Sequence, residues 1–367
     1  MAKSIENLSS VTRIGLDLAK NVFQLHAVDA AGAVIIARSV RRGALLRYFD
    51  KLPRCLVAME ACSSAHHWGR ALVALGFEVR LIPPAYVKPY VRRNKNDAAD
   101  AAAICEAVAR PNMRFLAVRS VENQAQLMRH RVRDMLVSQR TQLLNSVRGH
   151  LAEIGIVAPQ GAQHAYALKA LLTEGADANG EIVIPDCVRA ALLPLSQQID
   201  ALDAGIAAID KEIAALARND ATARRLMTIP GVGPLTASAI VATVRDLSAF
   251  ASGREFAAWL GLTPRQNSSG GKERLGRITK MGDRYLRKLL VVGACATLRH
   301  RAGHDDALRV WAGQLLERKS AAFRFKLTAV AIANKVARIA FALMTKGGDY
   351  CGRVYCGGED RPAPANA

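Results

Sequence analysis

Two carboxylates, Asp97 and Asp100, lie three residues apart in an Ala-rich stretch that is predicted to be helical. At that spacing they share one face of the helix, where their like charges repel each other. Arg93 and Lys95, just before them, could offset this repulsion, and so could a divalent cation. Arg92, Arg93 and Lys95 are also candidate ligands of a nucleic acid. Because Mg²⁺ binds carboxylate and phosphate oxygens together, the pair is a candidate metal site for phosphate chemistry.

Two more acids lie on predicted strands, Asp17 on the first and Glu60 at the end of the fourth. In a mixed sheet the first and fourth strands can be neighbours, which would bring both acids beneath the start of the Asp97 helix. Four carboxylates in one cleft suit two Mg²⁺ ions about 3.5–4 Å apart, the arrangement for in-line phosphoryl displacement. Taken singly, Asp17 could cap a turn, Glu60 could be a surface acid and Asp97 could cap the helix. The set of four beside a basic loop favours the metal site.

A second candidate lies in the polar, basic stretch from Thr263 to Lys280, which contains Ser268-Ser269-Gly270-Gly271. A serine flanked by glycines and cations could bind a phosphate, or attack one if a base or a metal activates its hydroxyl. A simple connecting loop is the alternative. The cations of this stretch are candidate ligands of a nucleic-acid backbone: Arg265, Lys272, Arg274 and Lys280.

The four acids need an α/β domain to bring them together, and residues 1–115 predict one. Alternating apolar residues and turn signals indicate two strands within 11–27 and further strands over 33–40, 55–59 and 78–82. Helices are expected over 43–52, 66–75 and from 97 to about 110. Three meandering strands followed by alternating helices and strands is the order of the ribonuclease H type of fold.

Residues 116–220 predict two long helices separated by an irregular loop near 155–190. The first, over about 122–154, belongs to a stretch with eight arginines between 110 and 148, which could follow a phosphate backbone or form an ordinary solvated face. The second carries a coiled-coil seam that could pair with the first helix, with its twin in a second chain, or with both, and we favour dimerisation, with an intramolecular hairpin as the alternative. The seam residues are Leu195, Ile199, Leu202, Ile206, Ile209, Ile213 and Leu216.

Residues 221–346 predict a mostly helical C-terminal domain. Ile229-Pro230-Gly231-Val232-Gly233, between two apolar helical stretches, is typical of a helix-hairpin-helix motif. Gly231 and Gly233 permit a tight turn whose backbone N–H groups, at a helix N-terminus, can bind phosphate without reading sequence. An ordinary turn with glycines for packing is the alternative. The Gly/Pro-rich residues 347–367 are expected to be a disordered tail.

The composition points to a polyanionic partner. The formal net charge is +20 and the pI about 10.1, and residues 254–346 hold 19 Lys and Arg against 6 Asp and Glu. Seven scattered cysteines without paired zinc spacing favour a reducing compartment. With no signal-peptide pattern, and a longest clean apolar run (289–298) too short to span a bilayer, we expect a soluble cytoplasmic protein without membrane contact.

In combination, these motifs resemble the DEDD transposases of bacterial insertion sequences of the "one-ten" type, and the resemblance covers nearly the whole chain. The N-terminal markers are Ile14-Gly15-Leu16-Asp17, Met59-Glu60-Ala61-Cys62 and Lys95-Asn96-Asp97-Ala98-Ala99-Asp100. The C-terminal markers are Ile229-Pro230-Gly231-Val232-Gly233 and Gly261-Leu262-Thr263-Pro264-Arg265, running into Ser268-Ser269-Gly270.

The resemblance implies a RuvC-like N-terminal domain whose catalytic and metal-binding residues are Asp17, Glu60, Asp97 and Asp100, with Mg²⁺ as the metal. It implies a coiled coil used to assemble a dimer or tetramer. It further implies a serine nucleophile, which maps to Ser269 or its neighbour Ser268, a covalent phosphoserine, and a noncoding bridge RNA that joins donor and target DNA.

Two other functions fit parts of the pattern. A RuvC-like nuclease, such as a junction resolvase, would use the four acids to activate water and would not need the serine. A nucleic-acid-binding scaffold would use the acids structurally and would break no strands. The transposase reading explains the acids, the serine stretch and the charge together.

Overall fold

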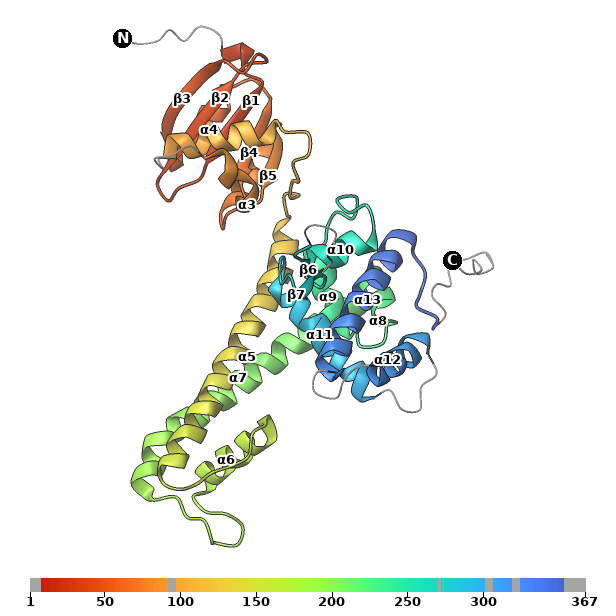
Figure 1. Ribbon diagram of the computed structural model, residues 1–367. Coiled ribbons are helices and arrows are strands. Elements are labelled where there is room, and N and C mark those ends of the chain that lie inside the picture. Colours follow the sequence, from red (N-terminus) through yellow and green to blue (C-terminus); the bar gives the residue numbers. More distant parts are fainter. Residues whose placement is uncertain are drawn as a thin grey trace, which may run out of the picture. The chain divides into compact units, whose positions relative to one another are not determined.

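A mixed five-stranded sheet occupies the N-terminal part of the chain in the computed structural model (Figure 1). The structure describes residues 8–91, 97–268, 272, 274–300, 306–318 and 324–352. The chain divides into two compact units, Met1–Gln124 and Ala125–Ala367, each with its own hydrophobic core.

The sheet of the first unit has the strand order β3-β2-β1-β4-β5. β1 pairs antiparallel with β2 and parallel with β4, and β5 continues the parallel half. The predicted mixed α/β domain is therefore confirmed, and its first and fourth strands are neighbours. The strands are β1 (Arg13–Asp17), β2 (Val22–Val28), β3 (Val34–Arg41), β4 (Leu56–Glu60) and β5 (Glu78–Ile82).

Helices cover this sheet and close its core. Figure 1 shows α4 lying across the strands. Its buried residues, Ile104 among them, pack against Ala58 and Ile82 of the parallel half, while α2 buries Trp68 and Leu72 in the core that contains Phe23. The helices are α1 (Leu45–Phe49), α2 (Ala65–Ala74), α3 (Pro84–Val87) and α4 (Asp97–Val108), with short 3₁₀ turns at Leu8–Ser10, Arg42–Ala44 and Lys88–Tyr90.

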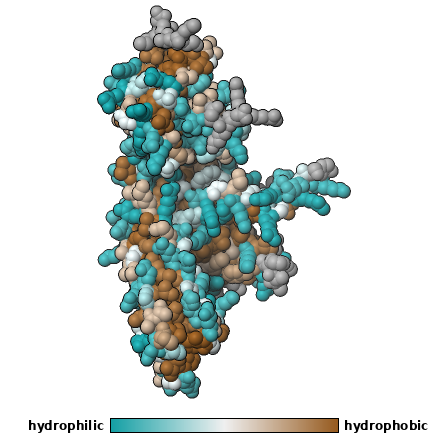
Figure 2. Space-filling model, turned by 90° about the vertical axis from the view of Figure 1, so that its left-hand side faces the viewer, coloured by the Kyte–Doolittle hydropathy of each residue, from teal (hydrophilic) through white to brown (hydrophobic). Residues whose placement is uncertain are grey.

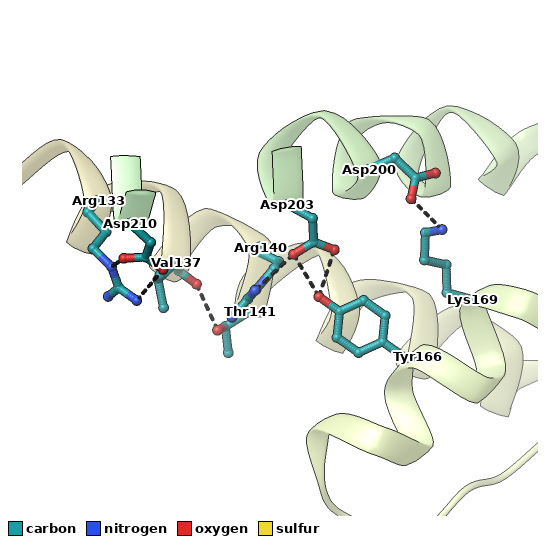
Figure 3. Close-up of polar contacts among 9 residues, drawn as sticks. All are labelled: Arg133, Val137, Arg140, Thr141, Tyr166, Lys169, Asp200, Asp203 and Asp210. Atoms are coloured by element: carbon teal, nitrogen blue, oxygen red, sulfur yellow. Dashed lines mark hydrogen bonds and ion pairs between the residues drawn. The ribbon is translucent and has the colours of Figure 1, made fainter. Parts of the chain in front are cut away.

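Two long helices, α5 (Val121–Glu153) and α7 (Asp186–Asn219), run antiparallel, with α6 (Ala162–Glu174) beside them. Charged pairs tie the three helices together (Figure 3). Asp203 of α7 accepts hydrogen bonds from Arg140 of α5 and from the Tyr166 hydroxyl of α6, each at 2.8 Å. Lys169 of α6 lies 2.7 Å from Asp200. The hairpin is thus held by interactions within one chain.

Helix α6 corrects the prediction of an irregular loop near residues 155–190. Leu168 and Leu172 are buried in one cluster with Val147 and Leu151 of α5 and Ile199 of α7. The glycines at both ends of the segment suggested a loop. In the structure they lie at the two ends of α6 instead. Gly175, for example, is the left-handed residue after the last turn of α6.

The seam of α7 is buried within the chain. Ile199 packs in the same cluster as Val147, and Leu202, Ile206 and Ile213 are 5%, 5% and 1% exposed. The intramolecular hairpin, which was the alternative to dimerisation, is therefore what this seam forms.

The same pairing uses most arginines of α5. Arg129 and Arg133 form ion pairs with Glu212 and Asp210 of α7, and Arg140 pairs with Asp203. Arg148 donates to the carbonyl oxygens of residues 159 and 161. Because these guanidinium groups are engaged inside the hairpin, the helix does not present a uniformly basic face to a nucleic acid.

The C-terminal part of the second unit is mostly helical, as predicted. One buried cluster joins α8 to α13, with Phe256, Leu290, Ile332 and Leu343 among its members. The elements are α8 (Ala221–Met227), α9 (Pro234–Thr243), α10 (Gly253–Trp259), β6 (Pro264–Gln266), β7 (Leu275–Ile278), α11 (Arg284–Arg299), α12 (Ala307–Glu317) and α13 (Arg324–Lys346).

A buried polar contact anchors α5 to this core. His130 is 2% exposed, and its ring nitrogens lie 3.2 Å from the Ser238 hydroxyl of α9 and 3.3 Å from the Tyr285 hydroxyl of α11. Burial lowers the pKa of His130 to about 4, so the imidazole is neutral at physiological pH. A neutral imidazole can occupy this core without the cost of burying a charge.

Helix α13 is long and apolar enough to cross a membrane by length and composition. Here it is a core helix, because Ile332, Val336 and Ala340 are buried among the other C-terminal helices. Residues 347–352, counted in the predicted tail, are packed: the Tyr350 N–H donates to Thr228 Oγ1 at 2.8 Å. Residues 353–367 lie outside the described part of the chain.

Candidate active site

Three of the predicted acids converge at one edge of the sheet. Asp17 ends β1, while Asp97 and Asp100 occupy the first turn of α4. Carboxylate oxygens of Asp17, Asp97 and Asp100 all lie within 4.8 Å of one another. Strand and helix therefore bring together side chains that are 80 residues apart in the sequence.

Glu60 belongs to the same edge. It ends β4, which runs parallel to β1, and the pairing of Leu16 with Met59 places Glu60 at the level of Asp17. Its charge also acts on Asp17, where it adds to the rise in the pKa of that carboxyl group. The parallel register is thus the reason that the acids of the first and fourth strands meet.

The electrostatics of the cluster is unfavourable when all four groups are ionised. Burial, and then the carboxylates of Asp100, Asp97 and Glu60, together raise the pKa of Asp17 to about 6, against a hydrogen bond from the Leu18 backbone that lowers it. Asp17 is half-buried and Asp97 is exposed, so the cluster is accessible on one side. A cation placed among these oxygens would relieve the repulsion.

The donor set fits a hard divalent cation. Carboxylate oxygens are the ligands that Mg²⁺ and Mn²⁺ prefer, and no histidine or cysteine belongs to this cluster of described residues. Asp17, Asp97 and Asp100 would hold the ion. Glu60, at the end of the neighbouring strand, acts on the charge of Asp17 but is not one of these three ligands.

Gly15 sets the distance between α4 and the sheet. A Cβ atom at this position would lie 2.6 Å from the backbone nitrogen of Cys105 and closer still to the carbonyl oxygen of Ala101. Only a residue without a side chain allows α4 to lie this near to β1, two residues from Asp17. Gly15 was quoted only as part of a motif, and nothing in the isolated sequence gave it this role.

The predicted serine loop is the tip of a β-hairpin. β6 and β7 pair antiparallel, and the pairing continues outward through the Asn267 N–H, which donates to the carbonyl oxygen of Arg274 at 2.9 Å. The Arg274 N–H then donates to the Ser268 Oγ at 3.2 Å. Ser268 therefore links the two sides of the hairpin, while Ser269 lies outside the described residues.

The predicted cations are placed as follows. Lys272 and Arg274 are exposed at the hairpin tip, and Arg265, also exposed, donates to the Thr279 carbonyl oxygen at 3.3 Å. Lys280 has a positive φ of 56°, an unusual conformation for a side-chain-bearing residue at the base of this hairpin. Arg92, Arg93 and Lys95 lie outside the described residues.

The Gly231–Gly233 turn joins α8 to α9, and its two glycines differ. Gly231 has φ +83°, and a Cβ there would lie 2.5 Å from the Gly293 carbonyl oxygen of α11. Close packing against α11 therefore explains why residue 231 is a glycine. Gly233 is exposed just before α9, with φ −91° and open space where a Cβ would be. Packing within the described part of the chain does not explain why residue 233 is a glycine.

Comparisons with known proteins agree across both units. A family model described as "Transposase IS116/IS110/IS902 family" matches residues 223–309, and a DEDD transposase model of the IS110 type matches residues 14–156. The second match spans all four acids of the sheet edge.

Relatives that match over most of their length are also named transposases. The chain is 47% identical to a "Probable family 20 transposase" of Pseudomonas aeruginosa over 92% of this chain and 98% of the relative. It is 38% identical to the transposase for insertion sequence element IS1111A of Coxiella burnetii, over 95% and 94% of the two chains. It is also 38% identical to the transposase for IS1328 of Yersinia enterocolitica, over 93% and 98%.

An α/β domain with a convergent acidic edge, joined to a basic helical domain that matches a transposase model, defines a DEDD transposase, an enzyme that cuts and rejoins DNA. The chain belongs to the IS116/IS110/IS902 family of insertion-sequence transposases. DNA is accordingly its partner, in keeping with the net charge of +20.

Proposed function

We propose that the protein transposes its insertion sequence by a serine attack on DNA that is assisted by Mg²⁺ at the acidic edge. The observation that carries this proposal is the convergence of Asp17, Asp97 and Asp100, whose oxygens lie within 4.8 Å of one another. Glu60 completes the set of four. Bound Mg²⁺ would supply positive charge to the scissile phosphate and stabilise the leaving oxygen.

The residues of the chain have separate tasks. The four carboxylates would hold the cation, and the Ser269 hydroxyl is the nucleophile once a base has taken its proton. The Ser269 Oγ forms a bond to the scissile phosphorus as the bond from phosphorus to a deoxyribose oxygen breaks and that oxygen takes a proton. A second deoxyribose hydroxyl then displaces the serine and joins the new strand.

Ser269 is favoured over Ser268 as the nucleophile. The Ser268 oxygen already accepts a hydrogen bond from the Arg274 N–H across the hairpin, which gives it a structural task. Exposed cations at the hairpin tip, Lys272 and Arg274, would bind the phosphate that is attacked.

A denaturing gel tests the mechanism. The protein is incubated with Mg²⁺, RNA transcribed from the element and labelled DNA of the element ends, and a protein–DNA adduct is sought. We expect the adduct with the wild type and with Ser268→Ala, and none with Ser269→Ala or Asp97→Asn. Strand exchange that survives both serine substitutions would exclude the serine step. A Mg²⁺-dependent nuclease, such as a junction resolvase, would cut without any adduct.

We further propose that a noncoding bridge RNA guides the choice of DNA sites. The chain has few aromatic residues, 5%, and many cations, which suits binding of backbones better than reading of bases. Base pairing would then supply the specificity. Omitting the RNA from the same reaction should abolish exchange at the correct site.

DNA also contacts the turn before α9 in this proposal. Gly233 is exposed at the N-terminus of α9, where backbone N–H groups point away from the helix. Since a Cβ at Gly233 would meet no atom of the described protein, a phosphate approaching the backbone is a reason for glycine at this position.

We propose that a second copy binds the outer face of α5. The seam of α7 is occupied within the chain, but Met128, Val132 and Met135 of α5 are 55%, 41% and 53% exposed. Their spacing of four and three residues is that of a coiled-coil seam. Figure 2 shows hydrophobic surface interleaved with hydrophilic side chains on one side of the molecule.

A further inference from the structure

A cavity of about 460 Å³ lies beside the β6–β7 hairpin and belongs to none of the sites above. Its walls come from the hairpin, from α12 and from one stripe of α13. Most of the lining is apolar and includes Ile278, Leu315 and Val330. Cavities of this size commonly hold small organic groups, and a nucleobase is well within the range.

Three cations belong to the lining of the cavity. Arg277 of β7 and Lys335 and Arg338 of α13 line the cavity, and no carboxylate does so among the described residues. The Lys335 Nζ lies 4.2 Å from the centroid of the Trp311 ring, so an aromatic face rather than an acid stabilises its charge. Burial, and then the nearby Arg338, lower the pKa of Lys335. An anionic ligand would offset this excess of charge.

Asn334 contributes a side-chain amide to the lining. The Asn334 Nδ2 donates to the Leu262 carbonyl oxygen at 3.3 Å. This bond uses one amide hydrogen and leaves the side-chain oxygen and the other hydrogen for the edge of a ligand. Apolar walls with a single amide match the flat faces and polar edge of a base.

The position relative to the hairpin tip suits a DNA strand. Pro264, paired with Ile278, lines the cavity, and Ser268 at the tip is four residues further along. Four residues of extended strand span about 13 Å. That length corresponds to about four nucleotide steps of a B-form strand.

We propose that this cavity holds an unpaired base of single-stranded DNA, while Arg277, Lys335 and Arg338 bind the flanking phosphates. Contact with the apolar walls would accept any base, and Asn334 would favour those whose edge it can pair with. The inference rests on the proposed function in taking the hairpin as the place where a strand is cut. Binding itself requires neither Ser269 nor Mg²⁺.

Fluorescence anisotropy tests the cavity with the full chain in the absence of Mg²⁺. The probe is a dye-labelled strand of about 12 nucleotides, the length of one to three binding sites of a single-strand-binding module, together with strands that carry one abasic position each. We expect one abasic position to weaken binding most. Ala331→Phe, which fills the cavity, and Arg338→Gln should each weaken binding of the intact strand by about tenfold.

Lys326→Gln is the matched control, because Lys326 is an exposed cation of the same helix that does not line the cavity. Its effect should be about twofold or less. If Ala331→Phe fails to fold, Leu327→Glu replaces it at a wall position that is 53% exposed and should give the same loss.

Three results would overturn the inference: wild-type binding by a folded Ala331→Phe protein, equal losses for Lys326→Gln and Arg338→Gln, or tighter binding of an RNA strand of the same sequence. Failure of the serine mechanism is seen separately, as strand exchange that survives both Ser268→Ala and Ser269→Ala. The two ideas can therefore fail independently.

Discussion

Asp17 shows how one residue of the site opposes folding while it serves function. Its carboxylate lies among Asp97, Asp100 and Glu60, and its pKa is raised from 3.8 to about 6. At pH values between 3.8 and about 6, the folded state binds more protons than the unfolded state. The free energy of unfolding therefore falls as the pH rises through this range. Metal-free protein should therefore be less stable at pH 7 than at pH 5, and Mg²⁺ should restore stability.

Asp17→Asn should remove this dependence. Without metal at pH 7 the variant should be more stable than the wild type by up to about 3 kcal/mol, because the repulsion is gone. It should gain nothing from Mg²⁺ and should cut no DNA. Thermal unfolding in EDTA and in Mg²⁺ measures the effect. Asp50→Asn, at an exposed acid of the same unit, is the control, and a wild type with no pH slope would contradict the prediction.

Gly15 gives a second prediction at the residue scale. In Gly15→Ala the new methyl group would meet the backbone of Ala101 and Cys105, so α4 must shift away from β1. We expect a loss of about 3 kcal/mol in the free energy of unfolding. Weaker Mg²⁺ binding should accompany it, because Asp97 and Asp100 move with the helix. Gly43→Ala, where a Cβ meets nothing, is the control, and equal stabilities of the two variants would count against this account.

At the scale of elements, the two glycines of the turn between α8 and α9 should differ in role: Gly231 in packing and Gly233 in DNA binding. Gly231→Ala combines a positive φ with a clash against α11 and should cost about 2 kcal/mol or more of stability. Gly233→Ala should change stability by less than about 0.5 kcal/mol.

The same two variants test DNA binding. If a phosphate approaches the backbone of Gly233, the DNA affinity of Gly233→Ala should fall. Urea unfolding and DNA titration of both variants check this prediction. A stable Gly233→Ala protein with wild-type affinity would leave the turn with a structural role alone.

For the whole molecule, the proposed contact of a second copy with the outer face of α5 can be tested directly. Val132→Glu would place a charge in the middle of the exposed seam of Met128, Val132 and Met135 and should shift the protein from dimer to monomer. Folding should be unaffected, because Val132 is 41% exposed. Analytical ultracentrifugation measures the mass, with Thr141→Glu, exposed but off this seam, as the control. A wild type that is monomeric at all concentrations would rule out this interface.

The sequence alone predicted most strands and helices of the N-terminal domain and named the candidate acids. Strand alternation, the Ala-rich helix and the acids at element ends are local signals, so Asp17, Glu60, Asp97 and Asp100 could be named before the fold was seen. The helix over residues 162–174 was not predicted, because its apolar pattern is short and glycines flank it. This helix is stabilised by contacts with α5 and α7, which a local pattern does not show.

Only the tertiary structure decided what each surface contacts. The coiled-coil spacing of α7 specifies a partner but not which one, and the ion pairs of Arg133 and Arg140 show that α5 of the same chain fills that place. In the same way, the closeness of Asp17 to Asp100 follows from a parallel strand register and from Gly15, which admits the backbone of α4. Periodicity is a property of one segment, whereas pairing depends on the shape and charge of two.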